Sequence, residues 1–227
     1  MNERPNNLST LARRHALAAL VGTPLAATAL ASRAQTTTQR QATPTQTLGP
    51  FYPRSASERP HQIDADLLNV EGDRVLSKGS TLYLTGRVTT RSGAPVSNAL
   101  IEIWQCDANA VYHHPAGGAE SDRDPNFQGY GQMQTDADGA FHFRTIKPVP
   151  YPGRTPHIHV RVQAASHTAF ATQLYLPDHP GNQSDFLYRP MSEAERAAVA
   201  LKLQPTSAPH PLARATREMA RVELVIA

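Results

Sequence analysis

The stretch YPGRTPHIHVR, residues 151–161, gathers a tyrosine, an arginine and two histidines. Side chains two positions apart on a β-strand project from the same face, so His157 and His159 are expected to point the same way. A pair of imidazoles on one strand face is a common way for a rigid sheet to present a metal ion. The pair alone has another interpretation, two histidines on the solvated face of an edge strand. Without further ligands, zinc or copper is the usual metal.

Two tyrosines accompany the histidines. Tyr151 lies six residues before His157 and follows the proline-restricted segment KPVP, and Tyr112 follows the run IEIWQCD in a polar loop. A phenol ionises near pH 10 in water, but a highly charged, hard cation stabilises the phenolate. The four side chains together favour ferric iron and disfavour zinc or copper, whereas either tyrosine alone is also explained as a core ring with a satisfied hydroxyl.

Short strands joined by turns are expected to position these side chains. Apolar and alternating runs predict strands at 80–88, 100–106, 157–164 and 171–177, and the turn DADG predicts a hairpin over 132–146. Nineteen prolines, thirteen glycines and 40% hydrophobic residues in 227 fit short strands around a sizeable core. The expected fold is all-β, an antiparallel β-sandwich.

The C-terminal part differs in character. Ser192 is a candidate N-cap with Glu195 three positions later, the capping-box arrangement, so residues 191–203 predict a short C-terminal helix that Pro205 ends. The apolar run 220–227 predicts a return to the sheet as an edge strand.

Residues 1–34 have the features of a targeting segment. Arg13 and Arg14 precede an apolar stretch too short and too proline-broken to span a membrane, and residues 32–34 offer small side chains for cleavage. Paired arginines before a weakly hydrophobic stretch resemble a twin-arginine signal, which passes folded, cofactor-loaded proteins. An ordinary secretory signal is the alternative. We expect export to the periplasm or the cell exterior, a flexible arm at 35–47 and a single domain at 48–227.

Charge and cysteine content limit the classes of binding partner and the ways in which the fold can be stabilised. The net charge of +3 is spread along the chain without a basic block, so nucleic-acid binding has no support. Cys106 is the one cysteine, so no intramolecular disulfide can form, and packing or a metal has to stabilise the fold. No membrane span is expected in the mature chain.

Several segments resemble the intradiol ring-cleavage dioxygenases, most of all the protocatechuate 3,4-dioxygenase beta-type chains: IEIWQCDANAVY, DPNFQGYGQMQTDADGAFHFRTIKPVPYP, GRTPHIHV and ATQLY. TPTQTLGPFYP, at 43–53, is similar to the segment before their catalytic domain. The resemblance runs from about residue 43 to residue 177 in the same order. It implies that four side chains ligate non-haem Fe(III), with hydroxide or water beside them: Tyr112, Tyr151, His157 and His159.

The resemblance also implies roles for Arg154 and Gln173. Arg154 would face the substrate ring, where a permanent cation stabilises negative charge as oxygen attacks, and Gln173 would lie on the substrate and oxygen side of the iron. The implied reaction uses O2 to cleave a catechol between its hydroxyl-bearing carbons, giving a cis,cis-muconate-type diacid. A surface arginine paired with a carboxylate and a strand glutamine in a polar slot are the alternative interpretations.

Two features depart from the family pattern. Only PGRTP separates Tyr151 from His157, fewer residues than in the protocatechuate-type catalytic chains, which predicts an open pocket and loose substrate choice. Ala110 stands where the family usually has glycine, which predicts a different turn before Tyr112.

Residues 86–146 also resemble the transthyretin-like (prealbumin-like) sandwich, so an exported, iron-free binding module is the alternative function. That alternative gives no reason for the tyrosines, arginine and histidines to occur together. The substrate stays open among protocatechuate, catechol, hydroxyquinol and larger lignin-derived diols. Members of the resembled family form homodimers and mixed assemblies, so a homo-oligomer is compatible with the resemblance.

Overall fold

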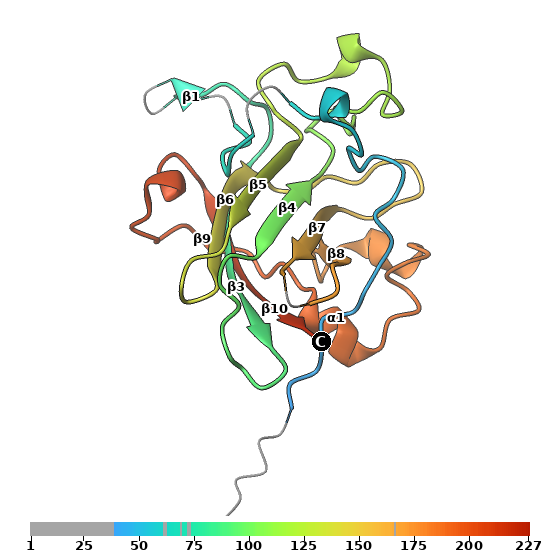
Figure 1. Ribbon diagram of the computed structural model, residues 1–227. Coiled ribbons are helices and arrows are strands. Elements are labelled where there is room, and N and C mark those ends of the chain that lie inside the picture. Colours follow the sequence, from blue (N-terminus) through green and yellow to red (C-terminus); the bar gives the residue numbers. More distant parts are fainter. Residues whose placement is uncertain (1–38, 61–62, 69, 72–73, 166) are drawn as a thin grey trace, which may run out of the picture. The chain divides into compact units, whose positions relative to one another are not determined.

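Residues 37–227 form one unit of the chain, and the computed structural model describes residues 39–227 except 61–62, 69, 72–73 and 166. The targeting segment expected at 1–34 lies outside the described residues. The described part is mostly β, with little helix, which confirms the all-β class (Figure 1). The strands are β1 (Val70–Glu71), β2 (Arg74–Val75), β3 (Thr81–Thr90), β4 (Leu100–Trp104), β5 (Tyr130–Gln134), β6 (Ala140–Ile146), β7 (His157–Gln163), β8 (Phe170–Tyr175), β9 (Gln204–Pro205) and β10 (Glu218–Ile226). The helical segments are α1 (Glu193–Ala198) and the 3-10 helices η1 (Ala56–Glu58), η2 (Glu120–Asp122), η3 (Pro180–Gln183) and η4 (Pro211–Ala213).

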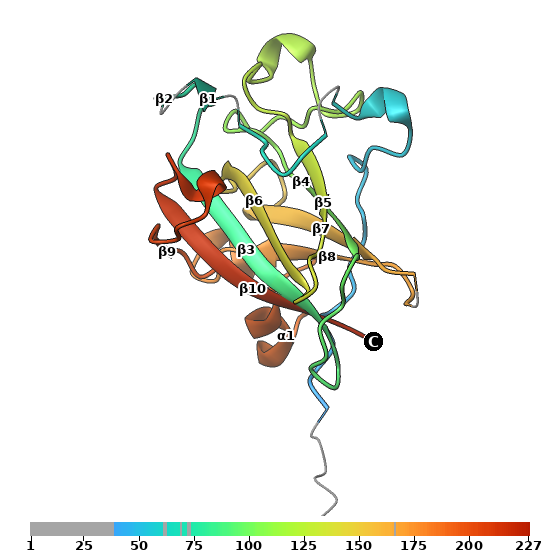
Figure 2. The ribbon, with the colours of Figure 1, turned by 60° about the vertical axis from the view of Figure 1, so that its left-hand side comes forward.

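Two four-stranded sheets have the orders β6-β3-β10-β9 and β5-β4-β7-β8, and Figure 2 shows β3, β6 and β10 side by side in the first. The hairpin predicted over 132–146 is wrong, because β5 pairs with β4 and β6 pairs with β3. The turn after Asp136 forms, with the amide of Gly139 donating to the Asp136 carbonyl at 3.0 Å. The turn therefore carries the chain from one sheet to the other.

The last strand also differs from expectation. β10 returns to the sheet but pairs in parallel with β3, and β9 pairs with its first residues, so the purely antiparallel sheet and the edge position are both wrong. The amide of Arg217 donates to the carbonyl of Thr81 at 3.2 Å, which brings the chain back to the start of β3. Both strands begin at the same end, and the long intervening chain supplies the crossover that a parallel pair requires.

The two sheets share one hydrophobic core. Alternation along β7 buries Ile158, Val160 and Val162 in this core and places His157 and His159 on the opposite face. The outer face of the β5-β4-β7-β8 sheet therefore carries the histidines predicted to bind metal.

The helix α1 is shorter than the predicted 191–203. Its capping box forms as predicted, because the Ser192 hydroxyl accepts from the amide of Glu195 and the Glu195 carboxylate accepts from the amide of Ser192. Beyond Ala198 the backbone bonds to β8 instead, with Leu201 donating to the carbonyl of Tyr175 at 2.7 Å. No helix in the described ranges has the length and apolarity to cross a membrane.

Residues 39–47, part of the expected flexible arm, hydrogen-bond to both sheets. The amide of Thr43 donates to Val225 of β10 at 2.9 Å, and the amide of Gln46 donates to Ala171 of β8 at 2.7 Å. The chain is thus tied to the sheets before it reaches the GPFYP segment.

Candidate active site

His157 and His159 bring two ring nitrogens together, with their Nε2 atoms 3.2 Å apart. Nδ1 of His157 lies 2.6 Å from the carbonyl of Thr155, which can only accept, so the proton is on Nδ1 and Nε2 carries the lone pair. Burial, with the charge of Arg154 adding to it, lowers the pKa of His157 to about 4. Burial and the neighbouring His157 hold the pKa of His159 well below its usual value. Both imidazoles are therefore neutral and able to ligate a cation.

The interpretation as solvated histidines on an edge strand is wrong. β7 lies between β4 and β8, and the exposed fractions of His157 and His159 are 2% and 1%. Trp104, the cross-strand neighbour of His159, stacks on that ring at 4.8 Å and 7°. Gly49 adopts φ +73°, and a Cβ there would lie 3.3 Å from Cε1 of His159, so the backbone of the GPFYP segment approaches this ring closely.

Tyr112 and Tyr151 reach the same place from two loops. The Tyr112 hydroxyl lies 3.4 Å from Nε2 of His157, and the Tyr151 ring centroid is 5.5 Å from the rings of both Tyr112 and His157. Burial raises the pKa of both phenols, that of Tyr112 well above its usual value. The structure thus brings all four predicted ligands together as neutral groups.

A tight turn places Arg154 beside Tyr151. The sequence has proline second and glycine third, Gly153 adopts φ +82°, and the amide of Arg154 donates to the Tyr151 carbonyl at 2.9 Å, the features of a type II turn. Nη1 of Arg154 lies 3.4 Å from the Tyr151 hydroxyl. The short PGRTP connection is therefore what sets the arginine next to the candidate ligand.

Ala110 lies in the loop that leads to Tyr112. It adopts φ +65°, in the left-handed region that favours glycine, and its amide donates to the carbonyl of Asp107 at 3.0 Å. The hydrogen bonds of the Asp107 loop hold the alanine in this glycine-like conformation, and the different turn expected before Tyr112 stays a prediction.

Arg154 and Gln173 contact each other, with Nη2 of Arg154 2.6 Å from Oε1 of Gln173. The sequence analysis missed Asp185, whose fully buried carboxylate accepts from Nε of Arg154 and from the amide of Thr155, both at 2.9 Å. Burial raises the pKa of Asp185, but hydrogen bonds from Thr155, Tyr188 and Arg154 outweigh it and hold the pKa below its usual value. A lone aspartate in NQSDF has no motif spacing that could have identified it.

The donor set suits one class of metal. Within the described part of the chain, no group of three or more His, Cys, Asp or Glu side chains is arranged to hold a metal ion. The candidate oxygen ligands beside the paired histidines are the hydroxyls of the two tyrosines. Two phenolates and two imidazoles fit Fe(III), since a hard trivalent cation stabilises phenolate oxygen, and they fit zinc or copper poorly.

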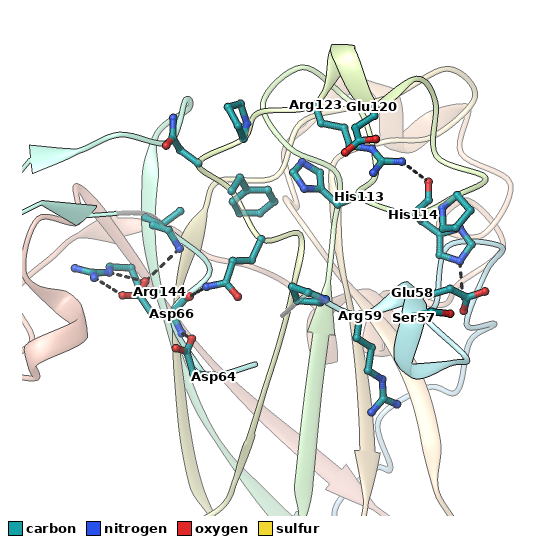
Figure 3. Close-up of a pocket in the computed structure, with 17 residues that line it drawn as sticks. Ser57, Glu58, Arg59, Asp64, Asp66, His113, His114, Glu120, Arg123 and Arg144 are labelled. Carbon is teal, nitrogen blue, oxygen red and sulfur yellow. Dashed lines mark hydrogen bonds and ion pairs between the residues drawn. The ribbon is translucent and has the colours of Figure 1, made fainter. Parts of the chain in front are cut away.

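A cavity of about 1150 Å³ lies near the Tyr112 loop, and Figure 3 draws the residues that line it. His113 and His114, which directly follow Tyr112, line it, whereas none of the six predicted site residues does. The Phe51 ring stacks on the Tyr112 ring with centroids 4.2 Å apart, and its centroid lies 6.1 Å from that of His114. Phe51 therefore contacts one candidate ligand and one residue that lines the cavity. The cavity and the ligand cluster are neighbours with separate linings.

A family model described as "Dioxygenase" matches residues 48–214. The chain belongs to the intradiol ring-cleavage dioxygenase family. It is 37% identical over 126 residues to the protocatechuate 3,4-dioxygenase beta chain of Burkholderia cepacia, covering 52% of this chain and 54% of that relative. It is 31% identical over 159 residues to the hydroxyquinol 1,2-dioxygenase of a Rhizobium species, covering 62% and 50%. The chain therefore spans about half the length of these curated relatives.

A solved structure extends the similarity to nearly all of another chain. The dioxygenase domain of a dioxygenase carbohydrate-binding protein fusion from Streptomyces sp. SirexAA-E is 29% identical, with a TM-score of 0.59, over 82% of this chain and 98% of that one.

Proposed function

We propose that this chain is a non-haem Fe(III) intradiol dioxygenase that uses O2 to cleave a catechol-type ring between its hydroxyl-bearing carbons, giving a cis,cis-muconate-type diacid. The carrying observation is the convergence of two neutral imidazoles and two phenols in a chain of this family. In this proposal the iron is held by Tyr112, Tyr151, His157 and His159. Bound Fe(III) supplies the Lewis acidity that favours the deprotonated diol and activates its ring towards O2.

The remaining roles follow from the neighbours of this cluster. Arg154 holds a fixed positive charge next to Tyr151, and Asp185 fixes its direction. Tyr151 is partly exposed and Tyr112 is buried, so Tyr151, which would be ionised as an iron ligand, is the one placed to take a proton from an incoming catechol hydroxyl. Gln173 accepts from Nη2 of Arg154 and so also helps to orient the guanidinium.

We further propose that the substrate site beside the four candidate iron ligands accepts several catechols. The turn between Tyr151 and Arg154 is short, and a Cβ added at Gly153, its exposed tip, would meet no atom within 4 Å. Turnover of protocatechuate, catechol and hydroxyquinol at comparable kcat/KM is the expected result. Activity on one of the three alone would contradict an open pocket.

The central test is the visible absorption of the chain from residue 35 onward, reconstituted with iron and then mixed with catechol without oxygen. A phenolate-to-iron band that shifts on adding catechol is expected, and Tyr112→Phe and Tyr151→Phe should each weaken it. Tyr83→Phe, a buried tyrosine in the other sheet, is the matched control and should leave the band unchanged. A colourless chain that binds iron poorly would favour the iron-free, transthyretin-like module.

We also propose export by the twin-arginine route, which rests on the sequence of residues 1–34. Replacing Arg13 and Arg14 together by lysine should stop export of the full chain. Unchanged export of that double variant would favour the ordinary secretory route.

A further inference from the structure

A buried carboxylate lies close to the ligand cluster and has no part in the proposed reaction. The Glu102 side chain of β4 is 1% exposed. Its Oε1 accepts from the hydroxyls of Tyr52 at 2.9 Å and Tyr130 at 2.7 Å, and its Oε2 accepts from Arg161 of β7. A buried carboxylate is costly unless it is fully hydrogen-bonded, so these partners have to hold their places around it.

One partner, Tyr52, belongs to a segment that covers the candidate ligands. This segment, residues 46–52, is called the strap here, and it follows the β7–β8 side of the sheet, in blue in Figure 1. Within the strap, Gly49 packs on His159 and Phe51 stacks on Tyr112. The strap therefore touches one candidate ligand from each of the two pairs.

The strap is fixed at both ends by side chains of the sheet. At its start, Nε2 of Gln173 donates to the carbonyl of Thr47 at 3.3 Å, and at its end the Tyr52 hydroxyl donates to Glu102. Phe51 directly precedes Tyr52, so a displacement of Tyr52 moves the ring that packs on Tyr112. The contact with Glu102 is a buried side-chain hydrogen bond of 2.9 Å, and its loss would leave the carboxylate one partner fewer.

We propose that Glu102 is a positioning residue of the candidate metal site: through Tyr52 it holds the strap against His159 and Tyr112. Its effect on catalysis rests on the proposed function, whereas its effect on the strap does not. The group that recognises Tyr52 lies in the sheet itself, so the strap takes its position from the same strands that carry Trp104 and the histidines.

The chain offers a matched pair of variants, because two tyrosines donate to the same oxygen atom. Arg161 lies over the Tyr52 ring and Arg59 over the Tyr130 ring, both at 5.6 Å. Each hydroxyl also has one further polar partner, Arg161 for Tyr52 at 3.2 Å and Gln132 for Tyr130 at 3.1 Å. Tyr52→Phe and Tyr130→Phe each remove one hydrogen bond to Glu102. Only the first removes it from the strap.

Hydrogen exchange of the iron-free chain is the first measurement. Tyr52→Phe should make exchange of the strap amides about tenfold faster, the equivalent of about 1.4 kcal/mol, while Tyr130→Phe leaves the strap as in the parent. Unchanged strap exchange in Tyr52→Phe, or equal acceleration in both variants, overturns the proposal. The comparison uses no iron, so it decides the proposal even if the chain proves not to be a dioxygenase.

The iron-loaded protein gives a second readout. Tyr52→Phe should shift the phenolate-to-iron band and raise KM for catechol. Both variants should lower thermal stability by a similar amount, but Tyr130→Phe should not move the band. A band and a KM that respond equally to both variants would mean that Glu102 is merely structural. If the parent shows no band, the proposed function fails while the exchange result stands.

Discussion

The clearest test of how the site is held is the substitution Asp185→Asn. Asparagine keeps the shape of the side chain but removes the charge that faces Arg154, and its amide nitrogen cannot accept the hydrogen bonds now made to one of the two oxygens. The exposed fractions of the Arg154 and Asp185 side chains are 8% and 0%, so water does not replace the lost partner. Removing one partner of such a buried pair costs about 3–5 kcal/mol, which lowers Tm by about 6–20 °C in a domain of this size.

The stability difference between the parent and Asp185→Asn should depend on pH in a defined direction. The folded-state pKa of Asp185 lies below its ordinary value, so its stabilising contribution is present above the unfolded pKa of about 3.9 and is lost as the pH falls through the folded pKa. In urea titrations, the parent and Asp185→Asn should differ most at pH 7, and the difference should shrink steadily as the pH falls below about 4. Asp138→Asn, at an exposed turn, is the control and should differ little from the parent at any pH. A difference at pH 7 below about 1 kcal/mol, or one that does not change with pH, would refute the reasoning.

Three further substitutions test local features. Ala110→Gly should raise Tm by about 2–4 °C because it relieves about 1 kcal/mol of left-handed strain, whereas Ala116→Gly, at negative φ, should lower it. In Gly117→Ala a Cβ would lie 2.2 Å from the Tyr112 carbonyl oxygen, so iron affinity in a chelator competition should fall; unchanged affinity would contradict this. Ser192→Ala should cost about 1 kcal/mol in urea unfolding, and no loss would mean that the capping box is unimportant.

The sequence predicts those parts of the fold that depend on local periodicity. Alternation places strands near β3, β4, β7 and β8, and the paired histidines fall on one face as the strand period requires. The parallel pairing of β10 with β3 and the split of β5 from β6 depend on which strands meet across the core. Apolar alternation is compatible with either partner, so it contains no information about that choice.

The same limit explains which polar residues were missed. Asp185 and Glu102 are single carboxylates whose side-chain partners are distant in the sequence, and Arg154 lies 31 residues before Asp185. Each was recognisable only once its burial and hydrogen bonds were known. Tyr112, Tyr151 and the two histidines belong instead to recurring segments, so their grouping could be expected before their geometry was seen.

His157 and His159 differ from two surface histidines because other segments of the chain pack over their face of β7. The outer face of an antiparallel sheet is commonly solvated, and HIH on such a face would keep ordinary imidazole pKa values. Here loops and the strap cover that face, which excludes water and leaves both rings neutral with their Nε2 atoms 3.2 Å apart. The motif HIH supplies only the direction of the two rings, and the covering segments, GPFYP among them, create the conditions for binding a metal. Variants of the strap should therefore affect the site as directly as variants of the strand.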